Sequence, residues 1–173
     1  MVIKKNPLGP TGDTVRENVL RYRNRLNLGY ADLARRLEAL GRPIPVLGLS
    51  RIEHGERRID VDDLMALAVA LGVSPTSLLL PDTTDADETV TATAIEGTAA
   101  DLLGWHRLYT PSAHIGRPAD ERFVRDAIRF IADARPRWDI EGLTLDQLPG
   151  VGHQEYGAEI AEKVRHTDSG TGT

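Results

Sequence analysis

Three short segments each combine a helical spacing of apolar residues with a glycine directly after their last residue. They span residues 30–40, 46–54 and 60–71. A helix commonly ends at a residue in the left-handed conformation, which glycine adopts without steric cost. In the first segment, Leu33, Leu37 and Leu40 fall on one helix face. Helices this short bury their apolar faces only against one another, so the pattern favours a compact all-α domain.

Two further helices are expected at the ends of this domain. Thr14 and Glu17 form a capping-box pattern, in which two side chains satisfy the first amides of a helix, and they predict a helix start at Thr14. Ser74, followed by proline, predicts another start, because serine caps well and proline suits the first helical position. We therefore expect a five-helix domain over residues 14–81, preceded by a flexible arm at residues 1–13.

The sequence beyond this domain has weaker patterns. Residues 82–95 are first acidic and then alternate threonine with apolar residues, which predicts a linker or a short strand. Residues 96–138 predict a smaller, mostly helical region, with helices at 98–109 and 119–134. The composition of residues 139–173 is typical of a disordered tail. The expected fold class is therefore mainly α.

Charge is distributed unevenly along the chain, whose net charge is −5. Residues 16–58 hold ten Arg or Lys against five Asp or Glu, whereas residues 83–173 hold nine against sixteen. Phosphate binding requires local positive charge rather than a positive total. The basic charge thus lies in the helical segments that would have to contact a nucleic acid.

Composition also excludes several classes of protein. The chain has no cysteine, so disulfides, thiolate metal sites and cysteine nucleophiles are excluded. No window approaches the ~18 consecutive apolar residues that a membrane span requires, and no apolar stretch follows the N-terminus. We therefore expect a cytoplasmic protein without membrane contact.

The central segments carry a set of residues that is characteristic in both type and spacing. The set comprises Leu33, Ala34, Ile44, residues 49–53 (Leu-Ser-Arg-Ile-Glu) and Gly55. It resembles the lambda-repressor-like helix-turn-helix proteins of the Xre family, over residues 14–80. A generic helical bundle would explain the glycines but not this set. The resemblance implies a DNA-binding domain in a bacterial or phage transcription regulator, and a repressor in particular.

One spacing departs from the family's pattern. The family's turn glycine follows the alanine of the first motif helix by about four residues, whereas Gly41 follows Ala34 by seven. Residues 42–45 contain two prolines, which exclude a helix there. Either the first motif helix is longer by a turn or the connecting turn is enlarged.

The second motif helix of such proteins enters the major groove of double-stranded DNA with its N-terminal residues. The resemblance therefore implies DNA contacts from Arg35, Arg36, Arg42, Val46, Leu47, Gly48, Ser50, Arg51, Arg57 and Arg58. Because Val46 and Leu47 are apolar, we expect modest base recognition, supplemented by a homodimer. Glu53 is instead expected to be structural, either pairing with an arginine of the same domain or capping a neighbouring element.

Two other functions are compatible with the sequence. The acidic C-terminal half would suit a protein-interaction or antitoxin-type module that binds a partner protein, and residues 96–138 are the expected site of self-association or protein contact. An enzyme would have to use histidines of the same half, of which His106, His114 and His153 lack any recognised metal-ligand spacing. We expect no catalytic residue, no metal and no cofactor, and therefore not an enzyme.

Overall fold

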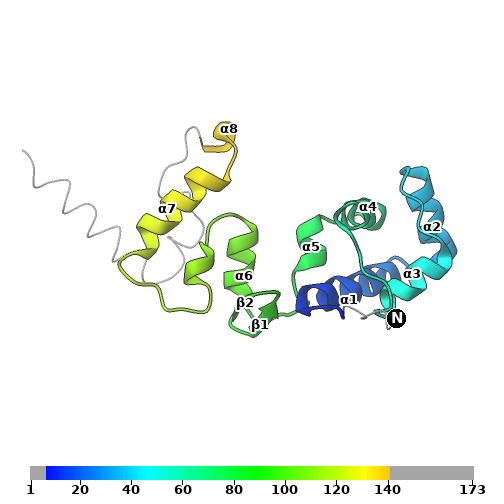
Figure 1. Ribbon diagram of the computed structural model, residues 1–173, viewed down its shortest axis with the longest axis horizontal. Helices are drawn as coiled ribbons and strands as arrows, with labels where there is room; N and C mark the ends of the chain where they lie inside the picture. The colour runs from blue at the N-terminus through cyan, green and yellow to red at the C-terminus, as the bar shows by residue number, and fades with distance from the viewer. Residues whose placement is uncertain (1–6, 141–173) are drawn as a thin grey trace, which may run out of the picture. The chain divides into compact units, whose positions relative to one another are not determined.

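The computed structural model describes residues 7–140, and this part of the chain is mainly helical (Figure 1). Its elements in chain order are α1 (Pro10–Arg25), α2 (Tyr30–Ala39), α3 (Val46–Glu53), α4 (Val61–Leu71), α5 (Pro75–Leu79), β1 (Thr89–Ala92), β2 (Ile95–Thr98), α6 (Ala99–His106), the 3-10 helix η1 (Ser112–His114), α7 (Phe123–Ala134) and α8 (Arg137–Ile140). The mainly α fold class is confirmed. None of the helices within residues 7–140 has the length and apolar character needed to cross a membrane.

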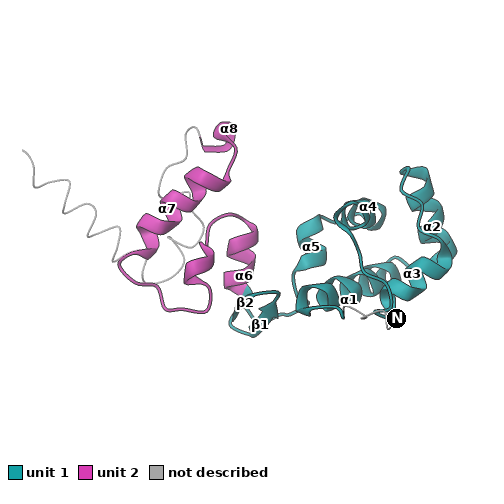
Figure 2. Cartoon of the chain, viewed as in Figure 1, with its two compact units in different colours: residues 1–99 teal, residues 100–173 magenta. Residues whose placement is uncertain are grey.

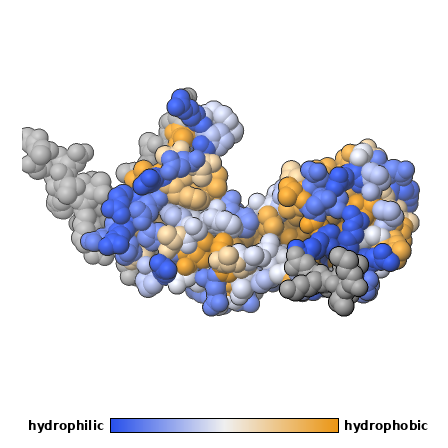
Figure 3. Space-filling model, viewed as in Figure 1, coloured by the Kyte–Doolittle hydropathy of each residue, from blue (hydrophilic) through white to orange (hydrophobic). Residues whose placement is uncertain are grey.

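The chain divides into two compact units, residues 1–99 and residues 100–173 (Figure 2). The first unit contains α1 to α5 and the β-hairpin, and the second contains the helices from α6 onward. Apolar residues reach the surface of both units among hydrophilic ones (Figure 3). All the residues predicted to contact DNA therefore belong to the first unit.

The core of the first unit forms where α1 to α5 bring their apolar faces together. Its largest fully buried apolar side chains are Val19, Leu33, Leu37, Ile44, Leu49, Ile52, Leu67, Leu71 and Leu78. Burying one such side chain stabilises the fold by about 1.5–3 kcal/mol. The apolar residues that recur at helical spacing in the sequence are thus the ones that face the common core of α1 to α5.

The first helix begins earlier than the capping-box pattern predicts. α1 starts at Pro10, with Gly9 at the capping position, so the expected start at Thr14 is wrong. Proline suits the first helical position because its φ is already helical and it has no amide hydrogen to satisfy. Residues 10–13 are therefore helical rather than part of a flexible arm, and residues 1–6 of that arm lie outside the described residues.

The other helix ends in this unit follow the signals in the sequence. Asp60 caps α4 by accepting a hydrogen bond from the Asp63 amide at 2.7 Å, and Ser74 caps α5 through the Ser77 amide at 3.1 Å. The glycines that follow α2, α3 and α4 all have positive φ angles, namely +76° at Gly41, +74° at Gly55 and +68° at Gly72. The glycine stops predicted from the sequence are confirmed.

A β-hairpin follows the helices of the first unit. β1 pairs antiparallel with β2, and the Thr93 amide between them donates to the Thr11 hydroxyl of α1 at 2.8 Å. Of the two alternatives that the sequence left open for residues 82–95, a linker or a short strand, the structure has the strand β1 at Thr89–Ala92. The helical region does not begin at residue 96 as expected, because residues 95–98 complete the hairpin and α6 starts at Ala99.

The second unit has buried apolar residues of its own, namely Leu102, Ile115, Ala127 and Ile131. His114 is also buried, and its Nε2 lies 3.0 Å from Asp126 Oδ2, a contact that lowers the pKa of Asp126. α7 begins at Phe123 rather than at the expected residue 119, after a turn in which Asp120 accepts the Arg122 amide at 2.9 Å. The second unit is thus helical, as expected.

Of the tail predicted to be largely disordered, the structure describes the first two residues. α8 extends to Ile140, so residues 139 and 140 are helical. Arg135 Nη1 donates to Asp139 Oδ2 at 3.0 Å and thereby joins α8 to the end of α7. The remainder of the predicted tail, residues 141–173, lies outside the described residues.

Asn18 joins α1 to α5, the first and last of the five helices described in the first unit. Its buried Nδ2 donates to the carbonyl oxygen of Leu78 at 2.9 Å and to that of Leu80 at 2.7 Å. Its Oδ1 accepts a hydrogen bond from Arg21 at 2.7 Å. One side chain thus satisfies two carbonyl groups at the end of α5.

Replacing Asn18→Ala is expected to lower the free energy of unfolding by about 1–3 kcal/mol, because two carbonyl groups lose their donor in a buried site. Urea unfolding followed by circular dichroism measures the change as a lower midpoint at an unchanged slope. The control is Asn24→Ala, an exposed asparagine on the same helix, which should change the value by less than about 0.5 kcal/mol. Equal effects of the two substitutions would contradict the role assigned to Asn18.

Candidate nucleic-acid interface

α3 has one buried face and one exposed face. The residues that it buries are Leu49, Ile52 and Glu53. On the other side, Leu47 is 60 % exposed, and Arg51 and His54 are exposed as well. Steps of four and three residues place these three side chains along one side of the helix. His54 Nδ1 lies 2.7 Å from the Ser50 carbonyl oxygen, so the stripe extends one residue beyond α3.

Glu53 fixes α3 against α1 and α2. Arg23 donates from Nε to Oε1 at 2.6 Å and from Nη2 to Oε2 at 2.8 Å, and the Tyr30 hydroxyl donates to Oε2 at 2.8 Å. The hydrogen bond with Glu53 raises the pKa of Arg23. Burial, together with the hydrogen bond to Glu53, raises the pKa of Tyr30 and keeps its proton on the donor. The predicted pairing of Glu53 with an arginine of the same domain is confirmed.

The turn between α2 and α3 is enlarged. α2 continues to Ala39, more than one helical turn beyond Ala34, and residues 40–45 then lead into α3. Ile44 is buried and anchors this turn in the core. Both the part of α2 beyond Ala34 and the turn at residues 40–45 therefore contribute to the spacing seen in the sequence.

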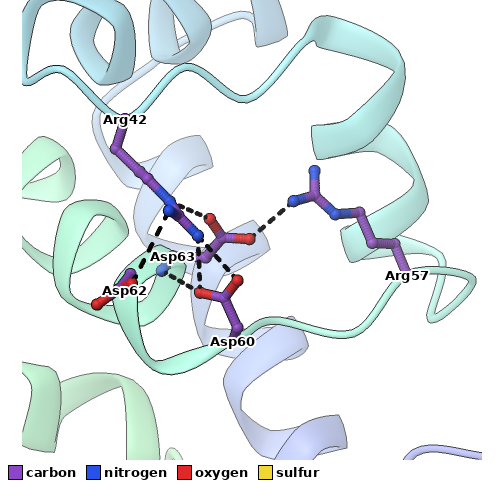
Figure 4. A network of polar contacts seen from close by, with 5 residues as sticks. All are labelled: Arg42, Arg57, Asp60, Asp62 and Asp63. Carbon is purple, nitrogen blue, oxygen red and sulfur yellow. Dashed lines mark hydrogen bonds and ion pairs between the residues drawn. The ribbon is translucent and has the colours of Figure 1, made fainter.

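Acids at the start of α4 bind arginines that lie on either side of α3 (Figure 4). Arg42, before α3, donates Nε to Asp63 Oδ1 and Nη2 to Asp60 Oδ2, both at 2.8 Å. Its Nη1 lies 3.9 Å from Asp62. Arg57, after α3, donates Nη2 to Asp63 Oδ2 at 2.8 Å. The Asp63 side chain is only 2 % exposed, and this one carboxylate ties both flanks of α3 to α4.

These contacts shift the pKa values of two groups in the network. The hydrogen bond with Asp63 raises the pKa of Arg42. The Asp63 amide, aided by the charge of Arg42, lowers the pKa of Asp60. Ionised Asp60 therefore stabilises the fold above its unfolded-state pKa, and this stabilisation is lost as the pH falls through the lower folded-state pKa.

Gly48 leaves room for the Arg57 guanidinium beside the first turn of α3. A Cβ at position 48 would lie 2.7 Å from Arg57 Nη1 and 3.1 Å from Ile44 Cγ2. Contacts of 2.7 Å are essentially never made by a real Cβ, so a larger residue would displace Arg57. Because Asp63 holds the other end of this guanidinium, its positive charge stays beside the N-terminus of α3, where backbone amides also favour anions.

Several of the predicted DNA-binding residues lie together in or beside α3. Those within the helix are Val46, Leu47, Gly48, Ser50 and Arg51. Within the described part of the chain, the Arg51 guanidinium makes no hydrogen bond or ion pair, so its charge is available to a ligand. Arg57 lies against Gly48, and exposed Arg58 donates to the Pro7 carbonyl oxygen.

The other predicted residues have partners elsewhere in the domain. Arg36 donates to the Ala70 carbonyl oxygen in α4 at 2.9 Å, and exposed Arg35 pairs with Asp32 one turn before it. For Arg36 and Arg42 the contacts indicate a structural role, because both guanidiniums join separate elements. A DNA contact of Arg35 stays a prediction.

Two residues in important positions were not selected from the sequence. His54 shares the exposed side of α3 with Arg51, and its spacing of three residues from Arg51 is the signal that identifies it. Asp63 has no comparable local signal, because its partner Arg42 is 21 residues away. Only the packing of α4 against the turn brings the two together.

A comparison with known families identifies the same region. A family model described as helix-turn-helix matches residues 19–78, from within α1 to within α5. No curated protein and no solved structure matches the chain. The matched region includes the enlarged turn, α3 and the whole acid–arginine network.

Replacing Glu53→Gln is expected to lower the free energy of unfolding by about 3–5 kcal/mol, because it leaves the Arg23 guanidinium without a counter-charge in a largely buried site. Urea unfolding measures the loss. The control is Arg35→Ala, which removes an exposed pair and should cost less than about 1 kcal/mol. A Glu53 variant as stable as the control would show that α3 is not held by this pair.

Replacing Asp63→Asn is expected to release both flanks of α3, because Arg42 and Arg57 lose their common carboxylate. The amides of Arg42 and Arg57, which bond the Leu37 and Arg51 carbonyl groups, should then exchange their hydrogens faster in exchange experiments. The matched control is Asp62→Asn, since Asp62 is exposed and 3.9 Å from Arg42. Unchanged exchange at both amides in the Asp63 variant would reject the coupling.

Proposed function

We propose that this chain regulates transcription by binding specific double-stranded DNA sites through α3. This helix belongs to the helix-turn-helix domain over residues 19–78, which resembles the lambda-repressor-like Xre type. The observation that supports the proposal is the exposed stripe of α3, with Arg51 at its centre. Arg57 and Arg58 follow α3 directly and add positive charge next to it. A helix with this exposure and charge is suited to the major groove.

Binding strength and base recognition come from different residues in this proposal. Arg51 and Arg57 supply contacts to phosphate oxygens, whose strength depends on salt because bound counterions are released. Val46 and Leu47 offer only apolar contacts, of which the thymine methyl group is the natural target. Base recognition by one copy is therefore modest, and a homodimer would add a second half-site.

The regulatory action that we propose is repression, in line with the resemblance of the domain to lambda-repressor-like proteins. A regulator of this kind acts where the chromosome lies, which in a bacterium is the cytoplasm. It needs no catalytic residue, metal or cofactor, so we propose a binding protein rather than an enzyme.

A second candidate function is an interaction module that binds a partner protein through the second unit. Ile128 and Trp138 of this unit are 45 % and 77 % exposed, and residues 83–173 hold an excess of acidic side chains. Exposed apolar residues beside acidic ones would suit a basic partner protein. Co-purification of a stoichiometric protein that requires residues 83–173 would favour this function.

The double substitution Arg51→Glu and Arg57→Glu is expected to abolish retention of DNA in a gel shift, because it reverses two charges at the proposed phosphate contacts. The DNA is a fragment selected from genomic DNA by the unaltered protein. The control is Arg129→Glu, which changes an exposed arginine of the second unit and should leave retention unchanged.

Salt dependence gives the quantitative form of this test. Arg57→Ala should reduce the slope of log affinity against log salt by about 1, the value expected for one lost phosphate contact. Unchanged retention by the double variant would refute the placement of the site on α3. Failure of the unaltered protein to select any fragment would refute the proposed function.

A further inference from the structure

α4 is apolar on both of its faces. Its inner face lies in the core through Leu67 and Leu71. On its outer face, Val61, Met65 and Val69 are 75 %, 49 % and 59 % exposed and follow one another at steps of four residues. The charged side chain on this outer face of α4 is Asp62. A helix that is apolar all round is normally buried on all sides, so the outer stripe lacks a covering partner in the described chain.

The outer stripe has the same residue types at the same spacing in both directions along the helix. Met65 lies at its centre, with a valine four residues before it and another four residues after it. A two-fold symmetric interface requires a surface that complements itself. Two antiparallel α4 helices would place Met65 against the partner's Met65 and Val61 against the partner's Val69. Antiparallel helices also bring opposite dipole ends together.

Charges near the two ends of α4 favour the same arrangement. Asp62 lies near the N-terminal end of α4, and its side chain is 81 % exposed. Exposed Arg36 lies at the other end of α4, where it donates to the Ala70 carbonyl oxygen. In an antiparallel pair, Asp62 approaches the end of the partner helix that carries Arg36. A parallel pair would instead bring the two Asp62 carboxylates together, which is unfavourable.

We propose that the outer face of α4 binds a second copy of this chain, with the two α4 helices antiparallel and Met65 on the two-fold axis. This rests on the proposed function, because it identifies the surface through which a DNA-bound regulator would pair. It places self-association on α4 rather than on residues 96–138, where the sequence suggested it.

The size of the stripe sets the strength of the pairing. Stable complexes bury about 800 Å² on each partner, which is more than three exposed side chains supply. Pairing between free molecules is therefore weak and transient, but an irreversible disulfide traps each encounter and accumulates. Pairing becomes effective when two copies occupy neighbouring half-sites, because the DNA then holds them at a high local concentration.

Cysteine cross-linking tests the register, since the chain has no cysteine of its own. Single variants Met65→Cys, Val61→Cys and Val69→Cys of the full chain are treated with a mild oxidant, and disulfide-linked dimers are counted on a non-reducing gel. A disulfide needs Cβ atoms about 3.5–4.5 Å apart. Met65→Cys should link to itself, and Val61→Cys should link to Val69→Cys in a mixture, whereas neither valine variant should link to itself. Leu26→Cys, which replaces an apolar residue 39 % exposed at the end of α1, gives the background.

Each outcome decides the proposal. Self-linking of the Met65 variant well above the Leu26 background, with linking of the two valine variants only to each other, supports it. Linking no better than background, or a Val61 variant that links to itself, overturns it. If Asp62→Arg is added to the Met65→Cys variant and the rate of disulfide cross-linking falls, the charge argument is supported. An unchanged rate overturns that argument. Circular dichroism confirms that each variant is folded.

The experiment separates this proposal from the proposed function, because cross-linking is measured without DNA. The reduced Met65 variant is also tested in the gel shift. Retained DNA binding without cross-linking rejects the α4 interface alone. Cross-linking without DNA binding by the unaltered protein rejects the proposed function alone.

Discussion

The buried ion pair of Glu53 is the interaction on which the DNA-binding candidate domain depends most. The carboxylate belongs to α3, yet its donors come from Arg23 in α1 and Tyr30 in α2. A buried carboxylate without such donors would be strongly destabilising, so the pair favours the arrangement in which the three helices bring these groups together. The orientation of the exposed side of α3 is therefore a consequence of what its hidden side binds.

Asp63 is a second buried carboxylate that positions α3, in this case by binding arginines at both ends of the helix. It holds Arg42 before the helix and Arg57 after it, so a single buried acid positions guanidiniums that are far apart in the sequence. Asp60 and Asp63 do not cancel the basic surface of this domain, because they neutralise the structural Arg42 and orient Arg57. Arg51, without a partner among the described residues, keeps its charge for a ligand.

Local signals in the sequence were sufficient for most of the fold and for part of the site. The glycines that end α2, α3 and α4, and the start of α3 at Val46, are determined by residues that are close in the sequence. The start of α1 was misplaced because two valid start signals compete, and Pro10 precedes Thr14. The role of Arg42 could not be predicted, since it depends on contacts 18 and 21 residues away. The sequence alone does not distinguish an arginine that binds an acid within the domain from one whose charge is available to DNA.

Gly48 limits how this domain could acquire a new DNA target. Positions 46, 47 and 51 are exposed on α3, so their side chains can be exchanged without disturbing a neighbour. Position 48 differs, because any Cβ there meets the guanidinium that Asp63 holds in place. Under the proposed function, base recognition can therefore be redesigned at positions 46 and 47, and phosphate contact at position 51, independently of one another. A change at position 48 would alter base contact and the phosphate contact of Arg57 together.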